Sequence, residues 1–308
     1  MFTVKRGRLA AIAAVAVGAV VALAGCASGD PLDTGSTSSA DSQTIVVGSQ
    51  DYYSNEIIAE IYAQALEANG ITVDRQFRIG QREVYLPEIT GGKIDVFPEY
   101  TGSLLQALEK TAAGGTADET YAELEKMLPS GLRVLDRAAA TDQNSWTVTQ
   151  AFADKYNLTD VASLKNVTEP ITVGGNSELE TRPYGPTALK EKYGIDVVGF
   201  KPVEDGGGPL TVKALVDGDI QLANIYTASP NIKSDNLVAL TDPDGLFFPD
   251  NVVPVVSEKV DDKAAAVLNK VSAALSAEDL VSLNAESVND QKSAKAIAAG
   301  WLEQAKLF

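Results

Sequence analysis

Histidine is absent from the 308 residues of this sequence, and cysteine occurs only once. Without an imidazole ring there is no Ser-His or Cys-His nucleophilic pair, no histidine general base and no histidine-ligated metal. The single cysteine, Cys26, excludes an intrachain disulfide and a cysteine-cluster metal site. We therefore expect a protein that holds neither a metal nor a cofactor.

Basic residues are also scarce, because 25 Lys and Arg stand against 42 Asp and Glu, giving a formal charge of −17. A nucleic-acid-binding protein needs a basic surface, so this balance argues against that class. Apolar residues make up 45% and charged residues 22%, which is typical of a globular chain and not of a disordered one. The length predicts about two domains.

The N-terminal segment has the pattern of a secretory signal. Three basic residues precede an apolar run over residues 9–23, which is short for a transmembrane helix of about 20 residues. The run ends in Leu-Ala-Gly-Cys26, which resembles a bacterial lipobox, where the cysteine thiol is acylated. We expect a signal peptide over residues 1–26 and a flexible Gly/Ser-rich linker over residues 27–43. The alternative is an ordinary signal anchor with an incidental cysteine.

The remainder of the chain contains an internal duplication. Three pairs of short segments match at offsets of 126, 124 and 126 residues: 45–49 with 171–175, 70–73 with 194–197, and 92–96 with 218–222. Each half predicts a strand, a helix, a second strand, a short helix and a third strand. The order β-α-β-α-β predicts two α/β lobes, each with a mainly parallel sheet and flanking helices.

The ends of several helices can also be predicted. Ser54 is the expected N-cap of the first helix, and Asn69-Gly70 its expected end. Ser276 begins a capping box, and residues 292–308 place apolar side chains on one helical face. This C-terminal segment has no counterpart in the repeat, so we expect it to cover the first lobe.

Two tyrosines occupy equivalent positions in the repeat. Tyr100 and Tyr226 each follow a predicted strand, and sheets of this kind bind ligands beyond the carboxyl ends of their strands. If the two lobes face each other, both rings reach one cleft. The alternative, in which each ring packs against its own lobe, stays open.

Motifs in both halves occur in a familiar order. Residues 94–102 read Ile-Asp-Val-Phe-Pro-Glu-Tyr-Thr-Gly, residues 142–146 Asp-Gln-Asn-Ser-Trp, residues 180–183 Glu-Thr-Arg-Pro, and residues 206–211 Gly-Gly-Gly-Pro-Leu-Thr. With the lipobox, they make residues 44–308 resemble the substrate-binding lipoproteins of glycine betaine/carnitine/choline ABC importers. The resemblance implies a two-lobed type II periplasmic-binding-protein fold with a ligand cleft between the lobes. We expect lobe 1 to comprise residues 44–142 plus 250–308 and lobe 2 residues 143–249, with hinges near 141–144 and 248–252.

The resemblance also implies a site in which aromatic rings enclose a quaternary ammonium and polar groups hold a carboxylate. Matched to the motifs, the aromatic positions are Tyr100, Trp146 and Tyr226, and the polar positions are Ser103, Asn144 and Arg182. In the alternative without ligand contacts, Trp146 belongs to the core of a lobe and Arg182 pairs with Glu178 or Glu180 on the surface.

Two positions depart from the family pattern. Asp250 stands at or near the place of a further cage aromatic, for which Phe248 is a candidate replacement. Gln50 stands where some relatives place a lysine that helps to hold the carboxylate. One cation fewer and one anion more would favour choline, or a different solute, over carboxylated betaines.

The resemblance implies an extracytoplasmic protein, lipid-anchored to the bacterial cell membrane, that captures a small osmolyte and performs no reaction on it. Its partners would be an ABC permease and the ATPase subunit of that permease, and it would be a monomer. Three alternatives stay open: the same role with a non-quaternary polar solute, a secreted enzyme, or a sensory or adhesive lipoprotein that feeds no transporter. Without histidine, the enzyme would need paired Asp or Glu carboxyls with separated pKa values.

Overall fold

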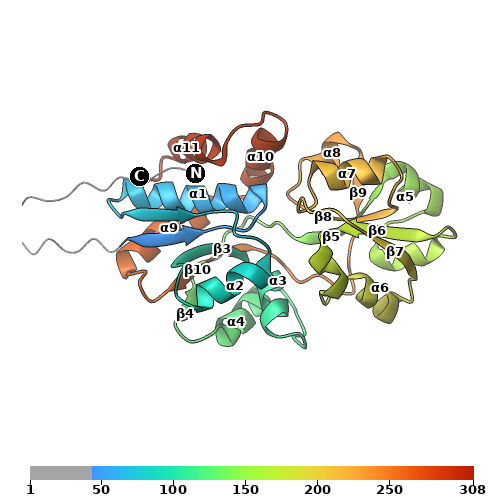
Figure 1. The fold of residues 1–308 in the computed structure, drawn as a ribbon, viewed down its shortest axis with the longest axis horizontal. Coiled ribbons are helices and arrows are strands. Elements are labelled where there is room, and N and C mark those ends of the chain that lie inside the picture. Colours follow the sequence, from blue (N-terminus) through green and yellow to red (C-terminus); the bar gives the residue numbers. More distant parts are fainter. Residues whose placement is uncertain (1–43) are drawn as a thin grey trace, which may run out of the picture. The chain divides into compact units, whose positions relative to one another are not determined.

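The structure is a computed structural model that describes residues 44–308, so the predicted signal peptide and linker, with Cys26, lie outside the described residues. Among residues 44–308 there is no helix with the length and apolar character needed to cross a membrane. The described chain is an α/β protein whose strands form two five-stranded sheets (Figure 1), as the repeat predicts.

The two sheets have the same strand order. The first sheet, in the order β2-β1-β3-β10-β4, contains β1 (Ile45–Gly48), β2 (Val73–Gln76), β3 (Val96–Tyr100), β4 (Leu132–Val134) and β10 (Val252–Ser257). The second, in the order β7-β6-β8-β5-β9, contains β5 (Asn144–Thr149), β6 (Ile171–Gly175), β7 (Val197–Pro202), β8 (Leu222–Tyr226) and β9 (Leu237–Ala239). The three matched segments of the sequence therefore lie in corresponding parts of the two sheets.

Each sheet contains one strand that runs against the others. β10 is antiparallel to both β3 and β4, and β5 is antiparallel to both β8 and β9, while the remaining neighbours are parallel. β5 and β10 are the first strands that the chain forms after crossing from one sheet to the other. They therefore start at the edge where the other strands end, and the sheets are mixed, with four strands sharing one direction.

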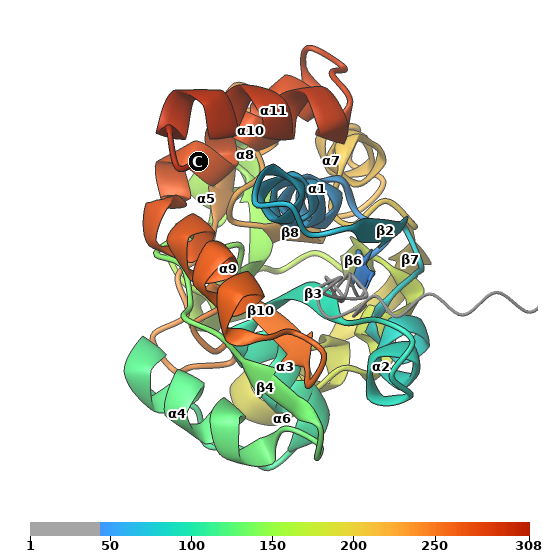
Figure 2. The same ribbon diagram turned by 90° about the vertical axis from the view of Figure 1, so that its left-hand side faces the viewer.

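Helices cover both faces of the first sheet (Figures 1 and 2). One face carries α1 (Tyr53–Ala68), which packs against α9 (Asp262–Ala274), α10 (Ala277–Val288) and α11 (Ala294–Ala305). The other face carries α2 (Arg82–Thr90), α3 (Thr101–Leu108) and α4 (Ala117–Met127). The prediction that the C-terminal helices cover the first lobe is confirmed by the packing of α9, α10 and α11 on α1.

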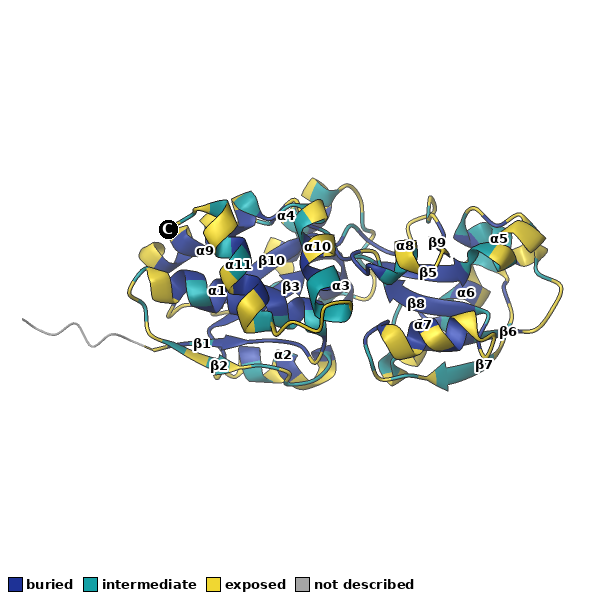
Figure 3. Ribbon diagram, turned by 90° about the horizontal axis from the view of Figure 1, so that it is seen from above, coloured by how far each residue is buried: buried dark blue, intermediate teal, exposed yellow. Residues whose placement is uncertain are grey.

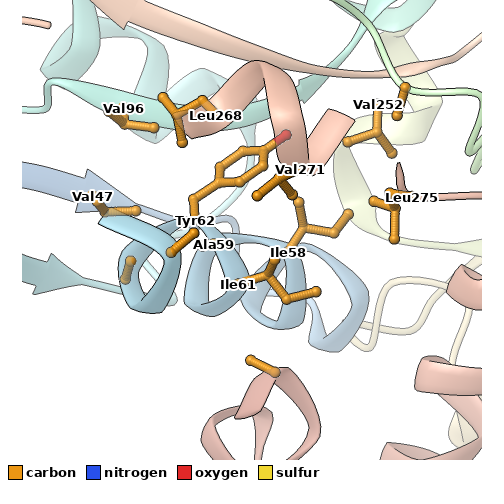
Figure 4. Close-up of a cluster of buried hydrophobic side chains, with 14 of the residues drawn as sticks. Val47, Ile58, Ala59, Ile61, Tyr62, Val96, Val252, Leu268, Val271 and Leu275 are labelled. Atoms are coloured by element: carbon orange, nitrogen blue, oxygen red, sulfur yellow. The ribbon is translucent and has the colours of Figure 1, made fainter. Parts of the chain in front are cut away.

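The core of the first lobe follows the alternation of its strands. Val252 of β10 faces the α1 layer, whereas Val253 faces the α2–α4 layer. In the α1 layer, Tyr62 is fully buried together with Val96 of β3 and Leu268 of α9 (Figure 4). Figure 3 shows the central strands as buried, while the edge strands β2 and β7 are only partly covered.

The second lobe has two smaller cores, one on each face of its sheet. Its helical segments are α5 (Gln150–Tyr156), η1 (Val161–Asn166), η2 (Ser177–Thr181), α6 (Pro186–Tyr193), α7 (Pro209–Val216) and α8 (Asn231–Ser234). The glycines before α7 form a turn in which Asp205 accepts hydrogen bonds from the backbone N–H groups of Gly208, Leu210 and Thr211. A carboxylate of the chain itself thus caps this helix.

One predicted helix end is wrong and two are confirmed. The N-cap of α1 is Tyr52 and not Ser54, which lies inside the helix. Asn55 explains the difference, because its side-chain oxygen accepts a hydrogen bond from the Gln50 backbone at 2.9 Å and so closes the turn. The helix does end at Asn69-Gly70, and Ser276 does form a capping box with Asp279.

The chain passes twice between the sheets, once before β5 and once before β10. The two crossing segments run side by side: Thr141 and Asn251 form an antiparallel bridge, and the backbone N–H of Asp142 donates to the carbonyl of Asp250 at 3.2 Å. The predicted hinge segments, 141–144 and 248–252, lie at the ends of these two crossings, where β5 and β10 begin. The lobe boundaries drawn through them stay our proposal.

Candidate ligand-binding site

Residues from both lobes line one small pocket with an internal volume of about 10 Å³. Its lining consists of Gln50, Tyr52, Arg82, Tyr100, Ser103, Asp142, Asn144, Arg182, Tyr226 and Asp250. The structure thus brings together seven of the predicted ligand-binding residues: Gln50, Tyr100, Ser103, Asn144, Arg182, Tyr226 and Asp250. The volume is enough for about one water molecule.

The strand directions explain why these side chains converge. Tyr100 and Tyr226 are the last residues of β3 and β8, where parallel strands present ligand-binding residues. In the sheets, Tyr100 pairs with Val252 and Tyr226 pairs with Asn144, which are the first residues of the reversed strands. The strand ends of each lobe therefore lie beside the two crossing segments.

Three tyrosines give the pocket its aromatic character. The rings of Tyr52 and Tyr226, from different lobes, lie with their centroids 4.9 Å apart and their planes inclined by 53°. Tyr100 is 5% exposed, and its hydroxyl lies 3.4 Å from the side-chain nitrogen of Asn55. Sequence reasoning missed Tyr52, which lies beyond the carboxyl end of β1 (Ile45–Gly48), whereas Tyr100 is itself the last residue of β3.

Trp146 and Phe248 do not line the pocket, so the structure does not bring these two predicted site residues together with the other seven. Trp146 is fully buried in the core of the second lobe, 6.2 Å from Phe247 between ring centroids. It shares a strand face with Asn144 but lies two residues, or about 6.6 Å, further from the strand end. Phe248 packs in the first lobe, so close to Gly102 that a Cβ there would lie 2.7 Å from it.

Arg82 is a buried cation of the pocket lining, and its charge is neutralised by the buried carboxylate of Glu99. Its Nε and Nη2 atoms donate to the two carboxylate oxygens of Glu99 at 2.9 and 2.8 Å. The Tyr85 hydroxyl and the Tyr100 backbone N–H also donate to Glu99, at 2.5 and 2.9 Å. With four donors on one buried carboxylate, this network fixes the start of α2 against the end of β3.

Arg182 follows η2 in the second lobe, and its side chain is 14% exposed. Its Nη2 atom lies 3.2 Å from a carboxylate oxygen of Glu83, which belongs to α2 of the first lobe. Its Nη1 atom donates to the Tyr184 hydroxyl at 3.2 Å. Arg182 therefore pairs across the lobes and not with Glu178 or Glu180.

Two aspartates of the crossing segments face the pocket, and each is already hydrogen-bonded. Asp142 accepts from the Tyr52 hydroxyl and, at 2.9 Å, from the backbone N–H of Ala228. Asp250 accepts from the backbone N–H and the hydroxyl of Ser103, at 2.7 and 2.5 Å. Burial raises the pKa of Asp142 and that of Asp250 to about 6, although these hydrogen bonds act in the opposite direction.

A larger cavity of about 530 Å³ adjoins this pocket and shares Arg82, Ser103 and Arg182 with it. Its other walls come mainly from α2, α3 and the segment after η2. The small pocket, which we call the tyrosine pocket after Tyr52, Tyr100 and Tyr226, is thus the narrow end of a cleft that both lobes line. No group of three or more His, Cys, Asp or Glu residues suited to a metal ion occurs within residues 44–308.

Two similar lobes, two crossing segments and a pocket lined from both sides define a solute-binding protein of the two-lobed class. Residues 43–304 match the model of the family described as the substrate binding domain of ABC-type glycine betaine transport systems, and the chain belongs to this family. It is therefore the substrate-binding component of an ABC importer, a class of protein that acts outside the cytoplasm.

Individual relatives agree with this assignment. The chain is 27% identical over 274 residues to the glycine betaine-binding protein YehZ of Escherichia coli, covering 84% of this chain and 90% of the relative. It is 24% identical over 280 residues to the carnitine transport binding protein OpuCC of Listeria monocytogenes, covering 86% and 88%. A crystal structure of a glycine betaine/carnitine/choline ABC transporter protein matches with a TM-score of 0.69 at 19% identity, covering 85% and 99%. The last likeness confirms the type II periplasmic-binding-protein fold.

Proposed function

We propose that this chain captures a quaternary-ammonium osmolyte, of the glycine betaine, choline or carnitine type, and delivers it to the permease of an ABC importer. The observation that supports this most is the convergence of Tyr52, Tyr100 and Tyr226 on one pocket. A trimethylammonium group has no N–H to donate, so hydrogen-bond acceptors cannot hold it. Aromatic faces attract it instead, by about 0.5–2 kcal/mol per ring.

The charges around the pocket also suit a cation. Arg82 and Arg182 contribute two positive charges to the lining, and Asp142 and Asp250 contribute two negative charges. Glu99 adds a third carboxylate directly against Arg82. Glu83, which pairs with Arg182, adds a fourth. Four carboxylates therefore stand against two guanidinium groups, and a ligand cation offsets this excess. A carboxylate on the ligand would instead approach Arg182, which can present a planar pair of donors.

Capture requires the lobes to separate, because the pocket as it stands holds no more than about one water molecule. The two crossing segments are the natural hinges, since they are the connections between the sheets. We propose that ligand binds between open lobes, that its contacts with both lobes favour closure, and that the closed form docks on the permease. The permease would work with a cytoplasmic ATPase, and the binding protein would be monomeric and perform no reaction.

The membrane attachment rests on the sequence. Cys26 at the end of the apolar run would carry the lipid, and residues 27–43 would tether the described domain to the membrane.

The test is isothermal titration calorimetry of the mature protein, extracted in dodecyl maltoside, which has no ammonium group. Choline, carnitine and glycine betaine are titrated separately, with proline betaine as a further ligand and glucose as a non-ionic control. The proposal predicts saturable heat with at least one quaternary ammonium. Tyr100→Leu and Tyr226→Leu should each weaken binding about fivefold or more, whereas Tyr156→Leu on α5 should not. Heat only with a non-quaternary solute, unaffected by the two pocket substitutions, would contradict it.

A further inference from the structure

The cavity of about 530 Å³ beside the tyrosine pocket has no part in the proposed capture of the cation. Its volume lies within the range of about 300–1,000 Å³ that is usual for sites of small organic ligands. Arg82, Ser103 and Arg182 line both spaces, so the two are continuous. A ligand whose cation lies in the tyrosine pocket can therefore extend into this cavity.

Two helices that begin at the tyrosine pocket form the long walls of the cavity. α2 begins at Arg82 and α3 begins directly after Tyr100, and both cover the same face of the first sheet (Figure 1). α2 lines the cavity from Arg82 through Leu86 to Thr90, at the four-residue spacing of one helical face. This stretch is about 12 Å long, because each helical residue adds about 1.5 Å. The cavity is thus a groove that leads away from the tyrosine pocket.

The walls of this groove are mostly apolar between its two ends. The apolar side chains are Leu86 and Pro87 of α2, Ala107 of α3 and Pro183 of the second lobe. These side chains offer no hydrogen bonds, so they suit methylene groups of a ligand better than polar groups. Lys110 lies after the end of α3, at the outer end of the groove, so the apolar stretch fits a short chain.

The inner end of the groove requires a ligand group that accepts hydrogen bonds. Arg82 and Arg182 lie where the groove meets the tyrosine pocket, and guanidinium groups only donate. A carboxylate accepts hydrogen bonds but ends the ligand at this junction. An ester accepts them and continues into the groove. We propose that the groove between α2 and α3 binds the acyl chain of a short-chain quaternary-ammonium ester, such as an acylcholine. This inference rests on the proposed function.

An acyl chain in the groove would contact both lobes. α2 and α3 belong to the first lobe, and residues 181–184 come from the second. The chain would therefore favour the closed arrangement of the lobes, as the cation does between Tyr52 and Tyr226.

The experiment compares two esters by calorimetry of the mature protein in dodecyl maltoside. Acetylcholine and butyrylcholine share the cation and the ester and differ by two methylene groups. Each buried methylene raises affinity about three- to fourfold, so we expect butyrylcholine to bind about tenfold more tightly. Tyr226→Leu should weaken butyrylcholine about fivefold or more, because the same ring holds the cation of the ester. Butyrylcholine binding that does not change in this variant would place the ester elsewhere and overturn the inference.

A variant that fills the groove assigns the preference to it. Ala107 is exposed and lines the groove, so Ala107→Phe adds a ring there without enlarging a core side chain. This variant should bring the two esters to within about twofold of each other and leave choline affinity unchanged. Ala266→Phe is the matched control, at an exposed residue of α9 outside the groove, and should keep the tenfold difference.

Three results would overturn this inference and leave the proposed function standing. They are binding of choline without binding of either ester, equal binding of the two esters by the unmodified protein, and a tenfold preference that persists in Ala107→Phe. Absence of binding by every quaternary ammonium would overturn the proposed function as well.

Discussion

Arg182 and Glu83 form an ion pair between the two lobes, with 3.2 Å between Arg182 Nη2 and a Glu83 carboxylate oxygen. Arg182 is mostly covered and lines the tyrosine pocket, whereas the Glu83 side chain is 55% exposed at the start of α2. The carboxylate of one lobe therefore occupies the arginine to which the resemblance assigns the ligand carboxylate. A carboxylated ligand and Glu83 would compete for the same guanidinium.

This competition predicts the effect of Glu83→Gln. Removing the rival charge should strengthen binding of glycine betaine or carnitine about two- to fivefold, the range expected for a partly exposed ion pair. Choline has no carboxylate, so its affinity should stay the same. Calorimetry with both kinds of ligand measures the difference. Glu88→Gln is the matched control, because Glu88 lies on the same helix and pairs with Lys93. Equal effects of Glu83→Gln on choline and on the carboxylated ligands would refute the competition.

The pH dependence of stability should reflect Asp142 and Asp250, whose pKa burial raises from 3.8 to about 6. Ser103, Arg82 and Glu99 surround Asp250, and Tyr52, Ser54 and the Ala228 backbone surround Asp142. Because the folded chain holds these two protons more tightly than the unfolded chain, their contribution becomes less favourable as pH rises from about 4 to about 6. Each group should account for up to about 3 kcal/mol of the free energy of unfolding across that window.

Urea unfolding between pH 4.5 and 7.5 checks this expectation. The double variant Asp142→Asn/Asp250→Asn should show a smaller loss of stability with rising pH than the unmodified protein. Asp244→Asn, at an exposed loop residue, should show the unmodified slope. An unchanged slope in the double variant would mean that neither carboxyl titrates as its burial predicts.

The position of Trp146 separates a structural role from a ligand-binding role. Because its ring is fully buried in the second lobe, Trp146→Phe should lower the free energy of unfolding by about 1–3 kcal/mol. Ligand affinity measured by calorimetry should change less than twofold. A loss of affinity greater than that of Tyr226→Leu, with stability unchanged, would place Trp146 back in the site.

Cys26 should determine where the protein is found in the cell. In the unmodified protein we expect an acylated N-terminal cysteine, detectable by mass spectrometry, and fractionation with membranes. Cys26→Ser should abolish acylation, since serine has no thiol. An acyl-free unmodified protein, or acylation that persists in the variant, would remove the basis for the anchor.

Much of the architecture could be predicted because the duplication repeats strand–helix patterns at a fixed offset. Those patterns placed Tyr100 and Tyr226 at strand ends, and the motifs added Arg182, Ser103, Asn144, Gln50 and Asp250, all of which line the pocket. The directions of β5 and β10 could not be predicted from the patterns, since they depend on where the chain enters each lobe.

The errors come from features that arise only on folding. Trp146 lies near a site motif in the sequence, but its depth in the sheet depends on the pairing of β5 with β8. Tyr52 was missed because it is outside the repeated segments. Ser54 was predicted as the N-cap of α1, but the helix begins earlier because Asn55 closes the preceding turn by accepting a hydrogen bond from the Gln50 backbone.

A crystal structure of the protein with choline would show whether the pocket formed by the three tyrosines binds the cation. The quaternary nitrogen should lie within about 6 Å of the ring centroids of Tyr52, Tyr100 and Tyr226, with the Tyr52 and Tyr226 rings further apart than 4.9 Å. Choline bound only in the wider 530 Å³ cavity, with the tyrosine pocket still closed by its own side chains, would contradict it.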